Sequence, residues 1–324
     1  MLRRWLAVLM CLIAIMSFSA CSGNNEEPED SVSIPSESKI KVSVTFDAMK
    51  EFVAAVGKDK VEISTIIPAG ADSHGFEPKA QDMVKLSSAE IFVYNGLGME
   101  EWAEDAISAA NNPALIIVDS SEGADVIERD ADAEEHEDEH EDGSEHEDEH
   151  GHSHGKYDPH LWLSLKGAQT QVNNIKDALV KADPSNKDYY EQNYDEFISR
   201  LDSLYSEYSS KFEGLEKRSF VTGHAAFGYL CRDFGLEQNS VRDIFAEGEP
   251  SAQQLVQLVE YCKENNVTAI FAEEMASPEV SQTLANEVGA KVEIIYTIEN
   301  PQNDMTYLER MESNLSKIYE SLTK

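Results

Sequence analysis

Basic side chains are scarce in this chain. Its 324 residues contain 26 Lys and Arg against 62 Asp and Glu, which gives a formal net charge of -36. That sign excludes proteins that must neutralise nucleic-acid phosphates. Apolar residues still make up 41% of the chain, so it can bury a core, and the acidity must be concentrated in one place. At roughly 150 residues per domain, the length predicts about two domains and excludes a small disulfide-stapled scaffold.

The N-terminal apolar run lacks the length of a membrane-spanning helix. It extends from Trp5 to Met16, whereas a span needs roughly 20 apolar residues, so an uncleaved anchor is the weaker alternative. Two arginines before the run and small residues after it predict a signal peptide over residues 1–20. Phe18-Ser19-Ala20-Cys21 resembles a bacterial lipobox, and residues 21–38 predict a flexible tether. We therefore expect an extracytoplasmic protein that is lipid-anchored to the bacterial cell membrane through Cys21.

Cysteine is scarce as well, with four residues in the chain. Cys11 lies in the predicted signal peptide and Cys21 is the predicted lipidation site, which leaves Cys231 and Cys262. In an oxidising compartment these two could form a disulfide, or both could be small buried hydrophobic residues, and the sequence favours neither alternative. Their spacing does not suit a zinc–thiolate cluster.

Short runs rich in β-branched residues alternate with segments of helical composition, which predicts parallel sheets. Four runs lie in the first half of the chain (39–46, 61–66, 89–94 and 114–119) and four in the second half (218–222, 236–241, 267–272 and 291–297). The pattern predicts an α/β fold with two lobes, an N-terminal lobe over residues 39–183 and a C-terminal lobe over residues 216–324.

A long amphipathic helix is predicted between the lobes, within residues 184–215. Aromatic and leucine side chains recur there at spacings of three and four residues: Tyr190, Tyr194, Phe197, Leu201, Leu204 and Tyr208. Ser185 with Asp188 is its expected N-cap, and we expect it to end near Glu213. Such a helix is roughly 40 Å long, enough to cross both lobes and to oppose a hinge motion. A coiled-coil dimer is the alternative source of the stripe.

The acidic residues are concentrated in an insert over residues 128–156 of the N-terminal lobe. From Glu128 to His150 it holds fourteen Asp or Glu residues and one Arg, with no apolar residue larger than Ala. Six histidines lie within nineteen residues: His136, His140, His146, His150, His152 and His154. A merely solubilising acidic run does not explain these histidines, because neutral imidazole is the commonest protein ligand for transition metals. We expect an auxiliary loop that collects cations.

Outside the insert the chain has only three histidines: His74, His160 and His224. Each lies in a loop that follows a predicted strand. A lone loop histidine is usually an ordinary surface residue. In open parallel sheets, however, ligands bind beyond the carboxyl ends of the strands, so loops from two lobes can converge on one cleft. Together the three histidines predict a metal site.

The motifs around these histidines resemble the solute-binding lipoproteins of metal ABC importers, the helical-backbone receptors, most closely the zinc-uptake branch. The motifs that carry the resemblance are His74-Gly75-Phe76-Glu77-Pro78, Asp158-Pro159-His160-Leu161-Trp162-Leu163, and Thr222-Gly223-His224-Ala225-Ala226-Phe227 with Gly248-Glu249-Pro250-Ser251. The resemblance extends from about Lys39 to Lys324. It implies a binding protein and not an enzyme, with pseudo-symmetric lobes, a rigid connecting helix and one transition-metal ion that is passed to an ABC transporter permease.

The resemblance also implies a carboxylate as fourth ligand, and Glu299 follows the last predicted strand, with Asp304 as a less favoured substitute. Three imidazoles and one carboxylate suit tetrahedral Zn²⁺, whereas Mn²⁺ prefers more oxygen donors, so zinc is expected and a manganese or iron receptor is the alternative. Glu77 and Asp158 are expected to orient imidazole rings, although loop capping would explain them equally well.

Two other classes of protein compete with a monomeric receptor. A secreted zinc hydrolase also uses three histidines, but it needs an open fourth position. The chain matches His-Glu-x-x-His at residues 136–140 and 146–150 and Gly-x-Ser-x-Gly at residues 151–155. All three matches lie in the acidic insert, whose composition predicts neither the helix nor the strand-to-helix turn that these motifs need. A surface adhesin with incidental metal binding would expose an apolar patch, which the sequence does not reveal.

Overall fold

The computed structural model describes residues 38–129, 155–243, 250–274 and 279–323. Residues from Ser38 onward form one compact unit. The predicted signal peptide, the tether with Cys21 and the six histidines of the insert lie outside the described residues. Among the described helices, none has both the length and the apolar character that crossing a bilayer requires.

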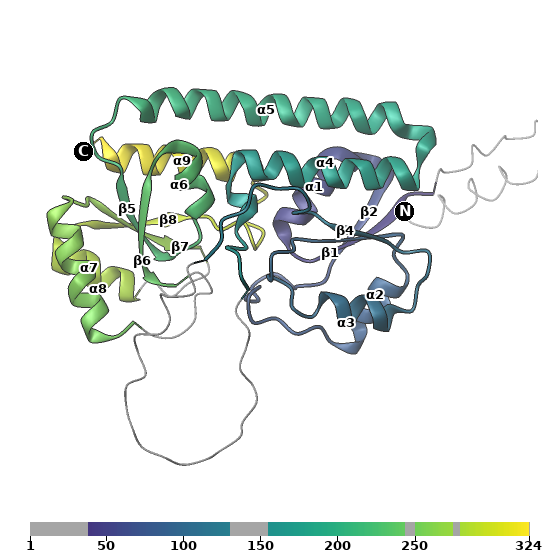
Figure 1. Cartoon of the computed structure of the whole chain (residues 1–324), viewed down its shortest axis with the longest axis horizontal. Helices are drawn as coiled ribbons and strands as arrows, with labels where there is room; N and C mark the ends of the chain where they lie inside the picture. Colours follow the sequence, from purple (N-terminus) through teal and green to yellow (C-terminus); the bar gives the residue numbers. More distant parts are fainter. Residues whose placement is uncertain (1–37, 130–154, 244–249, 275–278, 324) are drawn as a thin grey trace, which may run out of the picture. The chain divides into compact units, whose positions relative to one another are not determined.

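Two four-stranded sheets, all of whose paired strands are parallel, form the two lobes (Figure 1). The first has the order β2-β1-β3-β4 and the second β6-β5-β7-β8, so the two lobes repeat one strand order. The strands are β1 (Ile40–Val44), β2 (Val61–Thr65), β3 (Ile91–Tyr94), β4 (Ile116–Asp119), β5 (Ser219–His224), β6 (Glu237–Arg242), β7 (Ala269–Glu273) and β8 (Lys291–Ile295). The two-lobed parallel α/β fold that the sequence predicts is confirmed.

Helices cover both faces of each sheet, because alternate residues of a strand point to opposite faces. Phe92 of β3 packs toward α2 (Ala80–Ser87) and α3 (Ala103–Ala110), while its neighbour Val93 faces the large core beside α1 (Asp47–Gly57). In the second lobe Val221 packs toward α7 (Ala252–Glu264) and α8 (Glu279–Val288), and Phe220 faces the large core with α6 (Gly228–Phe234) and α9 (Tyr307–Leu322).

The long helix α5 (Lys187–Glu213) packs against helices of both lobes, α1 and α4 (Leu165–Ala182) along one half of its length and α6 and α9 along the other half (Figure 1). Its apolar stripe is buried as the spacing predicts except at Tyr194, which is partly buried, and Leu201 at its middle has no exposed surface. The predicted N-cap is wrong, since the helix begins at Lys187 after a 3₁₀ turn, Pro184–Asn186. Ser185 instead donates its hydroxyl to the Asp183 carboxylate, so Asp183 organises the turn.

The two segments that flank the insert pair with each other. Glu128 and Tyr157 form an antiparallel bridge, and Arg129 N–H donates to the Lys156 carbonyl. On the other side of the bridge, Asp158 N–H donates to Ile127 O at 3.0 Å. The segments before and after the insert are therefore held together, and this pairing ends two residues before His160.

Cys231 and Cys262 are free thiols, so the disulfide alternative is wrong. Cys231 on α6 belongs to the large core, whereas Cys262 on α7 packs in the small cluster on the opposite face of the second sheet. The sheet lies between the two thiols. Burial raises the pKa of Cys262 to about 11 and that of Cys231 further, so neither is a reactive thiolate at neutral pH.

A protein of residues 39–324, unfolded in guanidinium without reductant, is expected to react with a thiol reagent at two sites and at neither site when folded, because both thiols are buried and unpaired. Thiol titration under the two conditions checks this. Absence of reaction in the unfolded protein, restored by a reductant, would show a disulfide.

Candidate metal centre

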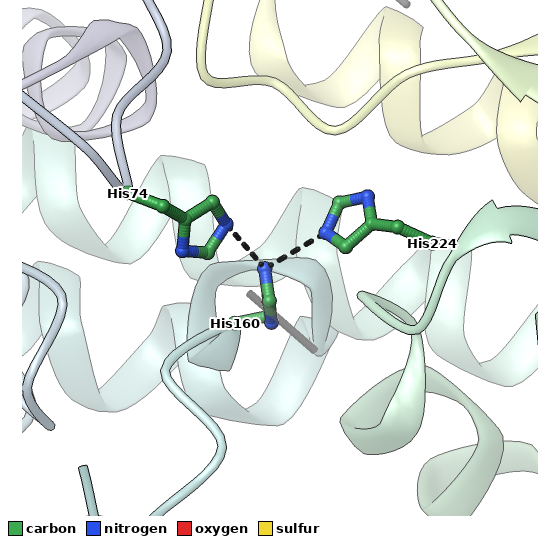
Figure 2. Close-up of side chains that lie close together, drawn as sticks. All are labelled: His74, His160 and His224. Carbon is green, nitrogen blue, oxygen red and sulfur yellow. Dashed lines mark hydrogen bonds between the residues drawn. The ribbon is translucent and has the colours of Figure 1, made fainter. Parts of the chain in front are cut away.

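Three imidazoles from three separate segments converge at one point between the lobes (Figure 2). His74 lies in the loop after β2, His160 directly precedes the short 3₁₀ helix η3 (Leu161–Leu163), and His224 is the last residue of β5. The Nε2 atom of His160 is 3.2 Å from Nε2 of His74 and 3.2 Å from Nε2 of His224. The sequence-predicted cluster is therefore assembled by the fold.

These spacings fit a tetrahedral metal ion. A Zn–N bond of about 2.0–2.1 Å places two ligand nitrogens of a regular tetrahedron about 3.3 Å apart. Among the described residues, His74, His160 and His224 form the one set of at least three metal-ligating side chains that lie close together. Their three ligand atoms all lie within 4.8 Å of one another. The donors are thus arranged for a single small cation.

His160 is held in one orientation by Asp158. Its Nδ1 lies 2.8 Å from Oδ1 of Asp158, and the same oxygen accepts the His160 backbone N–H at 2.9 Å. The ring has no exposed surface, and burial, reinforced by nearby His74, lowers the pKa of His160 well below its ordinary value. A neutral ring that donates Nδ1–H to a carboxylate presents the lone pair of Nε2 to the other two imidazoles.

His224 has a carboxylate partner of its own, Glu273 at the end of β7. Oε1 of Glu273 accepts the His224 backbone N–H at 2.8 Å and lies 3.8 Å from His224 Nδ1. Burial, with the nearby His160 and His74, lowers the pKa of His224, so this ring is neutral as well. The approach requires a glycine at 223, because a Cβ there would overlap Oε2 of Glu273 in its present position.

His74 is the partly exposed member of the cluster. Its loop begins after β2 and turns through Gly70, which adopts a positive φ of 85°. Asp72 Oδ1 accepts the backbone N–H of His74 at 3.0 Å, so a short side-chain turn sets the direction of the imidazole. Of the three ligand imidazoles, His74 is thus the one that solvent contacts most.

Glu299 and Glu77 do not belong to the cluster of ligand atoms that the three histidines form. Glu299 is buried in the segment after β8, and burial raises its pKa to about 7, but its carboxylate is not one of the mutually close ligand atoms. Glu77 is exposed in the loop that follows His74.

Sequence reasoning missed Glu273. The signal was present, since Glu273 ends a strand as His224 does, and the carboxyl ends of parallel strands meet at one edge of a sheet. What the sequence did not show is that β7 lies directly beside β5.

The comparisons with known proteins agree with a metal centre. The family model for the periplasmic zinc-uptake complex component A, ZnuA, matches residues 42–321. A Treponema pallidum protein described as a candidate metal-binding protein is 45% identical over 287 residues, 88% of each chain. The high-affinity zinc uptake system protein ZnuA of Bacillus subtilis is 38% identical over 327 residues, 99% of each chain.

A solved structure extends the likeness to three dimensions. The zinc-bound form of an AdcAII variant from Streptococcus pneumoniae is 31% identical, covers 88% of this chain and 98% of its own, and superposes with a TM-score of 0.75. Zinc-bound proteins of this kind therefore share the fold that assembles the three imidazoles here.

Replacement of Asp158 by alanine is expected to weaken Zn²⁺ binding about 10- to 100-fold, because the His160 ring loses the acceptor that fixes its orientation. Competition with a chromophoric chelator measures the change. Asp177→Ala is the matched control, since this carboxylate on α4 is 65% exposed and contacts Lys176 and Asn173 of its own helix. Equal affinities for the two variants would contradict a role for Asp158.

Proposed function

Because the chain belongs to the zinc-uptake complex component A family, we propose that it is an extracytoplasmic receptor that binds Zn²⁺ and delivers it to an ABC importer. Members of this family are solute-binding receptors and not enzymes. The observation that carries the proposal is the convergence of three imidazole nitrogens from both lobes, with Nε2 of His160 3.2 Å from each of the other two. A donor set of nitrogens favours Zn²⁺ over Mn²⁺, which prefers oxygen.

Glu299 is our proposed fourth ligand. Its carboxylate is buried beside the loop that carries His74, and a cation at the three imidazoles would offset the cost of ionising it there. Four protein ligands close the tetrahedron, and no position is left for an activated water. This distinguishes a receptor site from the site of a zinc hydrolase.

The remaining features complete the proposal. The permease of the importer is the expected partner, a lipid on Cys21 the membrane anchor, and the protein itself a monomer of two lobes, residues 39–183 and 216–324, connected by residues 184–215. The histidines of the insert would collect cations loosely, because its negative field raises their local concentration. Asp158 is our proposed orienting partner of His160, and the orienting role of Glu77, which is exposed, stays a prediction.

A variant that lacks residues 132–155 is expected to retain one tightly bound Zn²⁺ per chain, because the three converging imidazoles lie outside the deletion. His160→Ala in the same background is expected to retain none. Mass spectrometry of the native proteins after dialysis against a weak chelator counts the ions. One ion retained by the His160→Ala variant would refute the site.

Zinc affinity is expected to rise by up to about tenfold per pH unit between pH 6 and 7 and to level off above pH 8. The sign follows from Glu299, whose pKa is raised to about 7, so below that pH zinc must displace a proton from its carboxyl group. His160 and His224 stay neutral over this range because their pKa values are lowered. Chelator competition at pH 6, 7 and 8 checks the slope, which Glu299→Gln should reduce by about one proton. The same slope in both proteins would argue against Glu299 as a ligand.

A further inference from the structure

The segment Thr297–Asn300, which carries Glu299, is held by side chains from both lobes. Glu274 accepts the backbone N–H groups of Thr297 and Ile298, at 2.9 and 3.3 Å, and Trp162 donates its indole N–H to the Thr297 carbonyl at 2.6 Å. Ile298 has a φ of 61°, a left-handed conformation that a β-branched residue rarely adopts. Such a backbone persists only where its surroundings fix it, and it occurs preferentially at ligand-binding sites.

An ion pair between the lobes fixes the rest of this segment. Arg310 on α9 donates Nη2–H to Oδ2 of Asp47, the first residue of α1, at 2.7 Å, and the two side chains are 0% and 4% exposed. Arg310 also donates to the Asn300 carbonyl at 2.8 Å, and the Asp47 backbone N–H donates to the Glu299 carbonyl at 3.2 Å. The backbone on both sides of the Glu299 side chain is therefore anchored to the first lobe.

The side chain of Asn300 connects this segment to the loop that carries His74. Its Oδ1 accepts the Gly70 backbone N–H at 2.6 Å, and its Nδ2 donates to the Ala71 carbonyl at 3.4 Å. Asn300 is 6% exposed, and 230 residues separate it from Gly70. A buried amide that pairs with two successive backbone groups holds the loop much as a neighbouring strand would.

We propose that Asn300 is a positioning residue for metal binding, which ties the loop of His74 to the segment of Glu299 so that the two ligands approach the ion together. The proposal rests on the proposed function, because it concerns ligands of the same ion. His160 and His224 are oriented separately, by Asp158 and Glu273. Loss of the Asn300 amide thus releases His74 while it leaves those two imidazoles in place.

The test compares Asn300→Ala with Asn193→Ala in the mature protein. Asn193 is a matched control because it is also a buried amide, 5% exposed, that donates to a backbone carbonyl, that of Val56 at 2.8 Å, but it lies on α5 outside the metal centre. Zinc dissociation into excess chelator is expected to be about 10- to 100-fold faster in Asn300→Ala and within about twofold of wild type in Asn193→Ala. Equal rates in the two variants would overturn the proposal.

A second measurement separates positioning from a general loss of stability. In a His74→Ala background the Asn300→Ala change is expected to alter the dissociation rate by less than about twofold, because the ligand that Asn300 positions is already absent. The same 10- to 100-fold factor in both backgrounds would overturn the proposal. Bound Co²⁺ gives an independent signature, since loss of one ligand alters its visible absorption spectrum in Asn300→Ala and not in Asn193→Ala.

Asn300→Asp keeps the test decisive if the alanine variant does not fold. This variant retains an acceptor for Gly70 N–H and loses the donor to Ala71, so its dissociation rate is expected to lie above that of Asn193→Ala, and a rate equal to that control would overturn the proposal. The proposed function fails separately, if His160→Ala still binds zinc as the wild type does.

Discussion

The metal centre depends on one electron lone pair, that of His160 Nε2. The ring is fully buried, so it must be neutral, and its other nitrogen already donates to Asp158. Nε2 therefore faces two more imidazoles with an unshared electron pair, an arrangement that becomes favourable when a cation lies between the three rings. His74 and His224 reach the same point because the carboxyl ends of two separate parallel sheets face a common space.

The lobes that bring these loops together share one continuous apolar core. It extends from Val44 and Phe52 of the first lobe through Leu201 of α5 to Phe271 and Ile318 of the second. A wide hinge opening would expose part of this surface at a cost of about 25 cal/mol for each Å² of apolar area. Metal binding and release must therefore act on loops and side chains, while the sheets keep their relative positions.

Much of this architecture could be predicted from local patterns. The strands and the long helix have clear periodicity, and His74, His160 and His224 stand out because no other histidine lies outside the acidic insert. These signals depend on neighbours in the sequence. The start of α5 was predicted wrongly because two residues on either side of Pro184, Asp183 and Ser185, could both cap the chain there, and only the fold decides between them.

Other features depend on contacts that no local pattern encodes. Glu273 lies beside His224 only because β7, which is not the next strand along the chain, is a direct neighbour of β5 in the sheet. Asn300 forms hydrogen bonds to a loop 230 residues away, and Cys231 and Cys262 are separated by a sheet whose two faces cannot be assigned before the strand order is known.

The paired segments that flank the insert, Ile127–Arg129 and Lys156–Asp158, have a wider consequence. Because these two segments are paired, the entropy cost of closing a longer loop between them grows only with the logarithm of the loop's length. Evolution or a protein engineer can therefore exchange the intervening sequence, even for a reporter domain, without rebuilding the receptor.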